Sequence, residues 1–278
     1  MKLIDTHQHL WDLEQFPYSW CAGIPALNRS FRFDDYLAAA RNTGIEKTIF
    51  VEGDVDEPHL LAEAKHIQSL AETNPLIAGL VAAARPERSD FPRQLDDLLK
   101  LPKLRGLRRV LHVVPDESSQ SVLFAENIRR LAQFKLSFDL CVLARQLPLA
   151  FALAQKCPQV QFILDHCGVP DVKGRAFEPW RSELKELAAL PNVACKISGL
   201  IAYVDVKNWT PEDLRPWMEH TLDCFGWERI VWGSDWPVCN LTASLSEWVG
   251  ITEKLLASST ELQLEQLFYK NAERIYRV

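Results

Sequence analysis

The stretch Ile4-Asp5-Thr6-His7-Gln8-His9-Leu10-Trp11, close to the start of the chain, is predicted to form a β-strand. Side chains alternate between the two faces of a strand, so His7 and His9 share one face at a spacing of about 6–7 Å. Two imidazoles at this spacing can hold a divalent metal ion or the oxygen of a substrate. The structural alternative is a pair of histidines with ordinary hydrogen bonds near a strand end. The residues at the ends of the later strands decide between this structural interpretation and the functional one.

The rest of the chain repeats a strand followed by a helix. Segments such as FILDHCG at 162–168 are apolar on both faces, as expected of parallel strands that are covered by helices. Helix starts are marked by features such as Asp56 as a cap and Pro58 in a first turn. The further predicted strands are 47–53, 76–84, 104–112, 136–142, 160–166, 193–199 and 229–235, and the predicted helices are 34–42, 57–73, 91–101, 119–134, 146–156, 179–190, 211–225, 244–257 and 260–275.

Eight strands that alternate with helices over about 250 residues predict a (β/α)8 TIM barrel of the α/β class, as a single domain over residues 1–278. The alternative is an open doubly wound sheet, which usually has a glycine-rich phosphate-binding turn after its first strand, and this chain has none. The irregular segment 12–32 is long for a loop in a compact domain and is expected to be functional. Its Trp20 is a candidate to cover the site, or else to pack the loop onto the barrel.

Composition limits which binding partners and which cellular compartment we expect for this protein. The chain has 278 residues, 47% of them hydrophobic, which is ample for a large core. Its net charge of −6 gives no reason to expect nucleic acid or an anionic membrane as a partner. We expect no signal peptide, because Asp5 follows the start closely. We expect no transmembrane helix either, because no apolar run approaches the length of roughly 18 residues that a membrane span needs. Seven cysteines without a CxxC motif indicate reduced thiols of a cytoplasmic protein, with a catalytic cysteine as an alternative.

Barrel enzymes carry their chemistry at the C-terminal ends of the strands. An unpaired lysine in an apolar strand is costly, so Lys196 is expected to have a partner or a role. Other residues have structural alternatives: Asp139 and Asp165 could bind backbone amides, and Arg108 and Arg109 could be surface charges. The polar residues at the strand ends are His7, His9, Glu52, Arg109, His112, Asp165, His166, Lys196, Ser198 and Asp235, the last flanked by Trp232, Ser234 and Trp236.

Several of these stretches together resemble the amidohydrolase superfamily, in its amidohydrolase-2 branch. The resemblance implies the barrel fold and an enzyme. Within the branch, the chain is similar to the lactonase-rich group that includes sugar lactonases and pyrone-dicarboxylate lactonase. The matching stretches are DTHQHLW at 5–11, RGLRRVLH at 105–112, LDHCG at 164–168, CKISG at 195–199, WGSDWP at 232–237 and the closing NAERIY at 271–276.

The resemblance leaves two alternatives for a metal. Metal-bearing members of the superfamily usually add a histidine from the fifth strand, or a bridging lysine from the fourth strand or a glutamate in its place. The fifth strand here reads SFDLCV at 137–142, without a histidine, which argues against a binuclear site. One divalent metal, with zinc as the first candidate, would be bound by His7, His9 and Asp235, with Glu52 as a further ligand. The other alternative is no metal, as is thought for some lactonases of this group.

The function that the resemblance implies is hydrolysis of a lactone, in the first place a sugar lactone of the L-fucono-, L-rhamnono- or galactono-lactone type. Asp235 is expected to take a proton from water and to deliver it to the ring oxygen. His7, His9 and His166, or a metal that some of them bind, are expected to stabilise the oxyanion. The residues expected to bind the substrate are Glu52, Arg109, His112, Lys196, Trp20 and Trp236.

Two other functions remain open at this point. One is metal-dependent decarboxylation of an aromatic or unsaturated carboxylic acid, which the same branch performs and which requires a complete metal site. The other is a non-catalytic ligand-binding barrel, which gives no role to the combination of His7, His9, His166 and Asp235. The expected partner is a small molecule in each case. The sequence identifies neither the sugar nor the oligomeric state.

Overall fold

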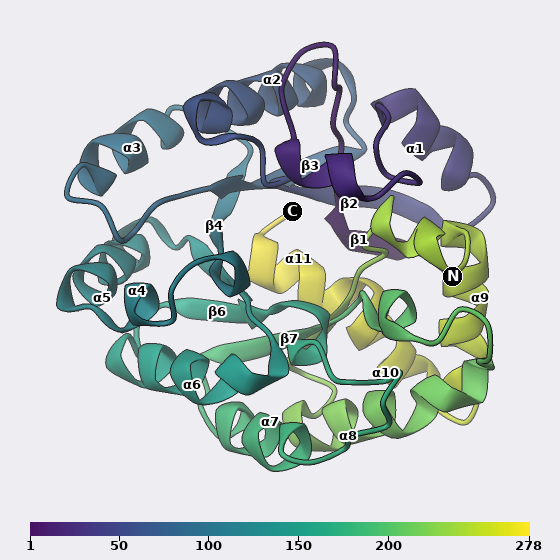
Figure 1. The fold of residues 1–278 in the computed structure, drawn as a ribbon. Coiled ribbons are helices and arrows are strands. Elements are labelled where there is room, and N and C mark those ends of the chain that lie inside the picture. Colours follow the sequence, from purple (N-terminus) through teal and green to yellow (C-terminus); the bar gives the residue numbers. More distant parts are fainter.

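The computed structural model describes residues 1–278, and its centre is one sheet of eight parallel strands in sequence order. After the last strand the chain closes the ring on the first: the amide of Asp235 donates to the carbonyl of His7, and that of His9 to Trp236, both at 2.8 Å. The predicted (β/α)8 barrel is confirmed, and the open sheet is excluded (Figure 1). The strands are β1 (Leu3–Gln8), β2 (Ile45–Val51), β3 (Ile77–Ala83), β4 (Leu104–Val110), β5 (Ser137–Cys141), β6 (Gln161–Leu164), β7 (Val193–Ile197) and β8 (Ile230–Trp232).

Helices surround the ring of strands, as Figure 1 shows. The helix predicted at 119–134 is divided because the Ser121 hydroxyl accepts the amide of Phe124 and starts a new helix. None of the helices is both long and apolar enough to cross a membrane. The helices are α1 (Phe33–Ala39), α2 (Leu60–Thr73), α3 (Phe91–Leu98), α4 (Glu117–Gln120), α5 (Val122–Arg129), α6 (Leu147–Lys156), α7 (Trp180–Ala188), α8 (Arg215–Phe225), α9 (Leu245–Leu255), α10 (Glu261–Glu265) and α11 (Asn271–Tyr276).

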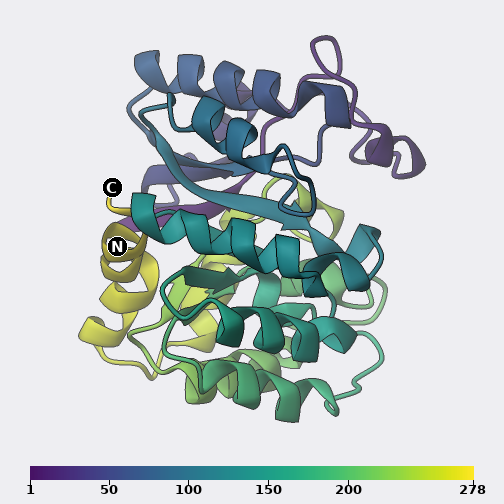
Figure 2. The same cartoon turned by 90° about the vertical axis from the view of Figure 1, so that its left-hand side faces the viewer.

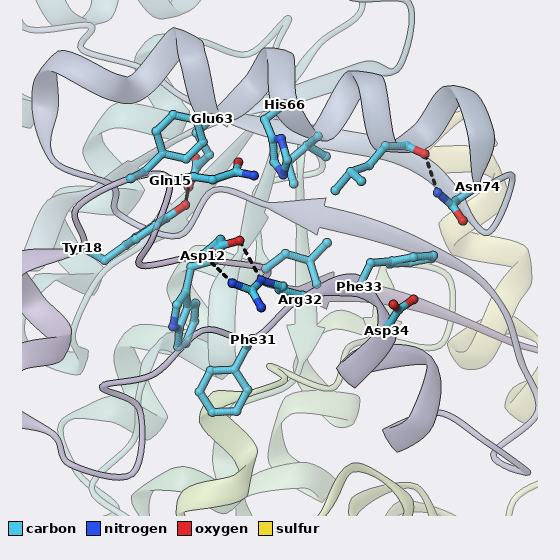
Figure 3. A pocket seen from close by; sticks show the side chains of 15 residues that line it. Asp12, Gln15, Tyr18, Phe31, Arg32, Phe33, Asp34, Glu63, His66 and Asn74 are labelled. Atoms are coloured by element: carbon cyan, nitrogen blue, oxygen red, sulfur yellow. Dashed lines mark hydrogen bonds and ion pairs between the residues drawn. The ribbon is translucent and has the colours of Figure 1, made fainter.

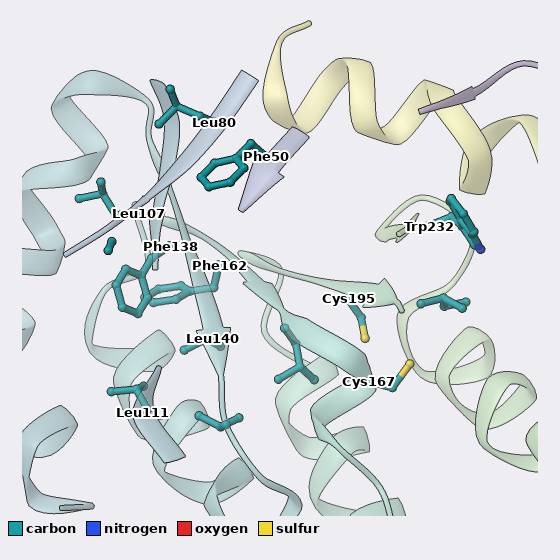
Figure 4. Close-up of a cluster of buried hydrophobic side chains, with 14 of the residues drawn as sticks. Phe50, Leu80, Leu107, Leu111, Phe138, Leu140, Phe162, Cys167, Cys195 and Trp232 are labelled. Atoms are coloured by element: carbon teal, nitrogen blue, oxygen red, sulfur yellow. The ribbon is translucent and has the colours of Figure 1, made fainter. Parts of the chain in front are cut away.

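Side chains on the strands alternate between the helices and the barrel interior. Phe138 on β5 and Phe162 on β6 belong to the large core between strands and helices, with ring centroids 6.1 Å apart (Figure 4). The next residue of each strand, Asp139 and Ile163, points the other way, into the barrel. A second hydrophobic cluster fills the interior and includes Ile4, Ile49, Val51, Val81, Ile163, Ala194, Val231, Ile275 and Tyr276.

The C-terminal helix α11 closes one end of the barrel. In Figure 1 it lies across the centre of the ring of strands, and its Tyr276 is completely buried in the interior cluster. In Figure 2 the yellow C-terminal helices and the purple 12–32 segment lie at opposite ends of the molecule. The opposite end, where the strands finish, is therefore the open one and is the place for chemistry.

The segment 12–32 is irregular, as predicted. An isolated bridge between Trp11 and Phe31 joins its two ends, and its one helical turn covers Ser19–Gly23. The indole N–H of Trp20 donates to the carbonyl of Gly53 at 2.8 Å, and the rings of Trp11 and Trp20 lie 5.4 Å apart. Trp20 therefore packs the loop onto the connection after β2.

Candidate active site

His7, His9, His166 and Asp235 come from the ends of three strands and meet at the open end of the barrel. The Nε2 atoms of His7 and His9 lie 3.1 Å apart. Oδ1 of Asp235 lies 3.4 Å from Nε2 of His9, 3.7 Å from Nε2 of His7 and 3.9 Å from Nε2 of His166. All four side chains are buried. The structure thus brings together the four residues proposed from the sequence as catalytic.

The backbone turns sharply where it presents two of these residues. The backbone φ angle is 54° at His166 and 57° at Asp235. Both values lie in the left-handed region that side chains other than glycine seldom adopt. A conformation of this kind costs of order 1–3 kcal/mol and is retained mainly at functional sites. The ring of His166 is held by the Ser198 hydroxyl, 2.9 Å from its Nδ1, and a Cβ at Gly199 would overlap the ring. The end of β7 is therefore shaped to hold His166.

Lys196 lies beneath His7 in the barrel interior. Its Nζ is 2.8 Å from Oδ2 of Asp139, 3.0 Å from Oδ1 of Asp165 and 3.1 Å from Nδ1 of His7. All four side chains are completely buried. Because these three atoms surround the ammonium group, Lys196 does not reach the open end. The prediction that Lys196 binds substrate is therefore corrected: its strand position directs it inward, below the site.

The protonation states follow from burial and from these charges. Burial, together with the Lys196 ammonium, lowers the pKa of His7 well below its ordinary value, and burial lowers the pKa of His166 as well. Burial opposes ionisation of Asp165, but Lys196 and His7 outweigh it and hold the pKa of Asp165 well below the usual range. Near pH 7 the two histidines are therefore neutral, and Asp165 is ionised. Neutral imidazole is the form that binds metals and accepts protons.

Arg108, on the inward face of β4, joins this group. Its Nη1 lies 3.4 Å from Nε2 of His7 and 3.4 Å from Oδ2 of Asp165, and its Nε donates to Glu52 at 2.7 Å. The other oxygen of Glu52 accepts the amide of Asp54 at 2.7 Å. Both oxygens of Glu52 are therefore engaged, so Glu52 orients Arg108 and is not free to bind a metal.

Two residues predicted to bind substrate have side chains that contact other partners. Arg109 follows Arg108 on the strand and so points outward, where its Nε donates to Glu87 at 2.9 Å. Trp236 is 2% exposed and packs against the rings of Phe31 and Tyr36, at centroid distances of 5.5 and 5.4 Å. The structure thus contradicts the expected position of Arg109, because alternation puts only one of the two arginines inside, and that one is Arg108. Trp236 packs the start of α1 onto the barrel.

At the rim, His112 is half-buried with its Nδ1 3.7 Å from Sγ of Cys141. The ring of Tyr203, which follows β7, lies 6.5 Å from that of His166. Alternation along a strand places Ser198 on the same face as Lys196 and could have identified it, but alternation alone does not say which of Arg108 and Arg109 faces inward. The site residues that the sequence analysis named without a catalytic, substrate-binding or metal role are Arg108, Asp139, Asp165 and Ser198, and it did not name Tyr203.

The donor atoms have the spacing that a zinc ion requires. Zinc bonds of about 2.0–2.1 Å in a tetrahedron place the ligand atoms about 3.3–3.4 Å apart. The separations among Nε2 of His7, Nε2 of His9 and Oδ1 of Asp235 are 3.1, 3.4 and 3.7 Å. In addition, Nδ1 of His9 lies 2.8 Å from the carbonyl of Val51. This contact directs the Nε2 lone pair of His9 toward Asp235. His7, His9 and Asp235 therefore fit a site for one metal ion. A ring nitrogen of His166 also lies within 4.8 Å of the donor atoms of His7 and Asp235.

A cavity of about 380 Å³ lies between segment 12–34 and α2 (Figure 3), and none of the four central residues lines it. Arg32 and Asp12 form an ion pair at 2.7 Å in its wall. Glu63 lines it and accepts hydrogen bonds from the Tyr18 hydroxyl at 2.9 Å and the Gly53 amide at 3.2 Å. Burial, with the nearby Glu52 carboxylate, raises the pKa of Glu63 to about 8.

Glu63→Gln is expected to make the protein more stable above pH 8 and to change little at pH 5. The folded protein holds the Glu63 proton up to a pKa of about 8, whereas the unfolded chain releases it near pH 4.5, so wild-type stability falls as pH rises through this window. Glutamine keeps the acceptor oxygen and removes this loss. Melting curves from pH 5 to 9 should diverge by about 2–4 °C for each kcal/mol recovered. The exposed Glu72→Gln on the same helix is the control, and parallel curves for Glu63→Gln and wild type would refute the expectation.

A (β/α)8 barrel that gathers neutral histidines, a carboxylate and an arginine at its open end has the architecture of a barrel enzyme with acid–base or metal-assisted chemistry. The amidohydrolase family model matches residues 4–278, and the chain belongs to this family. The resemblance found in the sequence is thereby confirmed.

Several individual proteins are similar over most of their length. A protein named L-fucono-1,5-lactonase from Burkholderia multivorans is 32% identical over 268 residues, which cover 90% of this chain and 87% of that protein. Another of the same name from Burkholderia ambifaria is 29% identical over 254 residues, covering 88% and 83%. The crystal structure of an amidohydrolase from Burkholderia multivorans with bound zinc is 29% identical, with a TM-score of 0.90 over 100% of both chains.

Proposed function

We propose that the protein hydrolyses a lactone, with sugar lactones of the L-fucono-, L-rhamnono- or galactono-lactone type as the first candidates. The observation that carries the proposal is the Asp235 carboxylate, whose Oδ1 lies 3.4, 3.7 and 3.9 Å from the Nε2 atoms of three histidines. The names of the Burkholderia relatives support the same substrate class. A lactone is an activated ester, so a general base beside donors for its carbonyl oxygen is sufficient for hydrolysis.

In the proposed reaction, Asp235 takes a proton from water while the water oxygen attacks the lactone carbonyl carbon. The carbonyl π electrons move to its oxygen and form a tetrahedral oxyanion. When the carbonyl re-forms, the bond to the ring oxygen breaks with its electron pair, and this oxygen takes the proton from Asp235. The product is a hydroxy acid, and Asp235 returns to its carboxylate form. The carboxylic acid of the product releases a proton to solvent near pH 7.

The oxyanion needs positive charge or hydrogen-bond donors in place before the reaction. Arg108 supplies a fixed charge 3.4 Å from His7, and its bonds to Glu52 hold it there. His7 and His166 supply ring nitrogens 3.7 and 3.9 Å from Oδ1 of Asp235. His7, His9 and Asp235 would hold a zinc ion, which when bound supplies Lewis-acid polarisation of the carbonyl. Half-buried His112 and Tyr203 at the rim are placed to contact substrate hydroxyls.

A pH-indicator screen of sugar lactones tests the proposal, with each lactone assayed on zinc-loaded and on chelator-treated protein. The expected result is acid release from one or more lactones above the spontaneous rate. Release of CO₂ from an aromatic or unsaturated acid would favour the decarboxylase. Saturable binding without turnover would favour a binding protein.

The seven free cysteines support our further expectation of a cytoplasmic location.

Arg108→Gln is expected to lower kcat/KM for the best lactone by about 10²–10³, the usual cost of removing an oxyanion-stabilising donor. Arg109→Gln is the matched control on the outward face and should lie within about threefold of wild type, as expected of a group that does not touch the oxyanion. Melting temperatures measured in parallel separate activity loss from unfolding. Equal losses in two folded variants would show that Arg108 has no special role.

A further inference from the structure

The surroundings of Lys196 consist of groups that normally bind metal cations. Its Nζ faces one carboxylate oxygen from β5, one from β6 and one imidazole nitrogen from β1, at 2.8, 3.0 and 3.1 Å. Carboxylate oxygen and imidazole nitrogen are the usual ligands of zinc and of similar ions. We call the group of Lys196, Asp139, Asp165 and His7 the Lys196 chamber. The ring of Tyr276 lies 6.0 Å from Nζ of Lys196, so α11 closes the lower end of this chamber.

Lys196 is the cation that neutralises Asp139. Asp165 is shared between Lys196 at 3.0 Å and Arg108 at 3.4 Å, whereas Asp139 has an ion pair with Lys196 alone. Two buried carboxylates therefore face the single buried ammonium group at 2.8 and 3.0 Å. The cation that pairs with these carboxylates is thus part of the chain itself and is fixed to β7.

His7 stands between this chamber and the proposed metal position. Its Nδ1 faces Nζ of Lys196 at 3.1 Å and Oδ1 of Asp165 at 3.4 Å, and its Nε2 faces Asp235 and His9. When Nδ1–H donates to Asp165, the lone pair of Nε2 is free for a metal ion. One imidazole thus has a permanent cation on one side and the candidate zinc ligands on the other.

We propose that the Lys196 ammonium occupies a second cation position of the barrel, so that the site accepts one divalent ion and excludes another. The cation is covalently part of β7 and supplies the positive charge between Asp139 and Asp165 that a metal ion would otherwise have to supply. It also holds His7 in place as a ligand of the proposed zinc position, and no second ion is needed for this. The inference concerns metal stoichiometry and stands whether or not the substrate is a lactone.

Metal titration of the 278-residue chain without substrate tests this proposal. All variants carry His220→Ala, because Sγ of Cys224 lies 3.3 Å from Nε2 of His220 and this pair on α8 could bind zinc by itself. Chelator-treated protein is titrated with Co²⁺ and with Zn²⁺, and the bound metal is counted after gel filtration. We expect at most one equivalent with Lys196 present and one additional equivalent in Lys196→Ala.

The additional equivalent should disappear in Lys196→Ala with Asp139→Asn, which removes one ligand of the chamber. Two equivalents in the protein that retains Lys196 would overturn the proposal. So would a folded Lys196→Ala variant that binds no more metal than its parent.

Lys196→Ala could fail to fold on its own, and a rescue experiment covers this case. The variant is refolded with propylammonium, with Co²⁺, or with propanol, the neutral counterpart of the amine. We expect either cation, but not propanol, to restore folded protein with a cooperative melting transition. Equal rescue by propanol would show that the chamber needs volume and not charge, and failure of both cations would show that it does not accept a free cation. Either outcome overturns the proposal.

Discussion

Asp235→Asn is expected to lower kcat on the best lactone by about 10²–10⁴, the usual cost of losing a general base. The amide has nearly the shape of the carboxylate but cannot accept a proton from water. The fold should remain, because the ion-pair contacts of the Asp235 carboxylate are with the three histidines, and its backbone bond to His7 does not depend on the side chain. Steady-state kinetics and melting temperature, measured on the same preparation, give the result.

Asp165→Asn is the informative comparison for this experiment. Its carboxylate is ion-paired with Lys196 and Arg108, so the amide should lower the melting temperature as well as activity. If Asp235→Asn reduces turnover less than about tenfold, the base lies elsewhere and His166 becomes the next candidate. If Asp235→Asn unfolds as readily as Asp165→Asn, Asp235 is a structural residue of the barrel mouth.

Lys196→Met is expected to destabilise the protein by about 3–5 kcal/mol, the typical cost of removing one partner of a buried ion pair. Methionine is similar in length and apolar, so it keeps most of the packing in the chamber. It leaves Asp139 without a cation, and Asp165 with Arg108 alone at 3.4 Å. Urea unfolding followed by circular dichroism measures the loss as a shift of the midpoint, with the slope checked for a change in cooperativity.

The double variant, Lys196→Met with Asp139→Asn, is expected to be more stable than Lys196→Met alone. It removes one positive and one negative charge, and the remaining Asp165 keeps its pairing with Arg108. Replacing both members of a buried ion pair by neutral groups is often close to neutral for stability. Additive losses in the double variant would mean that Lys196 and Asp139 do not interact energetically. Such a result would contradict their contact at 2.8 Å.

The strand ends show how far local sequence signals extend. The predicted strands 160–166 and 229–235 both run two or three residues beyond β6 and β8. Apolar runs and β-branched residues predict where a strand lies, but not where its backbone turns. His166 and Asp235 leave the strand geometry because the chain adopts positive φ there and directs both side chains into the site. The mismatch between prediction and structure is therefore located at the proposed chemistry.

The sequence by itself determined the alternation of eight strands and helices, because burial on both faces of parallel strands leaves a periodic apolar pattern. It also determined that His7, His9, His166 and Asp235 would come together, since all parallel strands of a barrel end at one rim. Only the tertiary structure decided that Arg108 rather than Arg109 faces His7, and that Lys196 lies below the site. Those contacts depend on the register between neighbouring strands, including an irregularity between Asp5 and Gln8 on β1, and on closure of β8 onto β1. Register and closure are set by packing between segments far apart in the chain, and a single segment carries no signal for them.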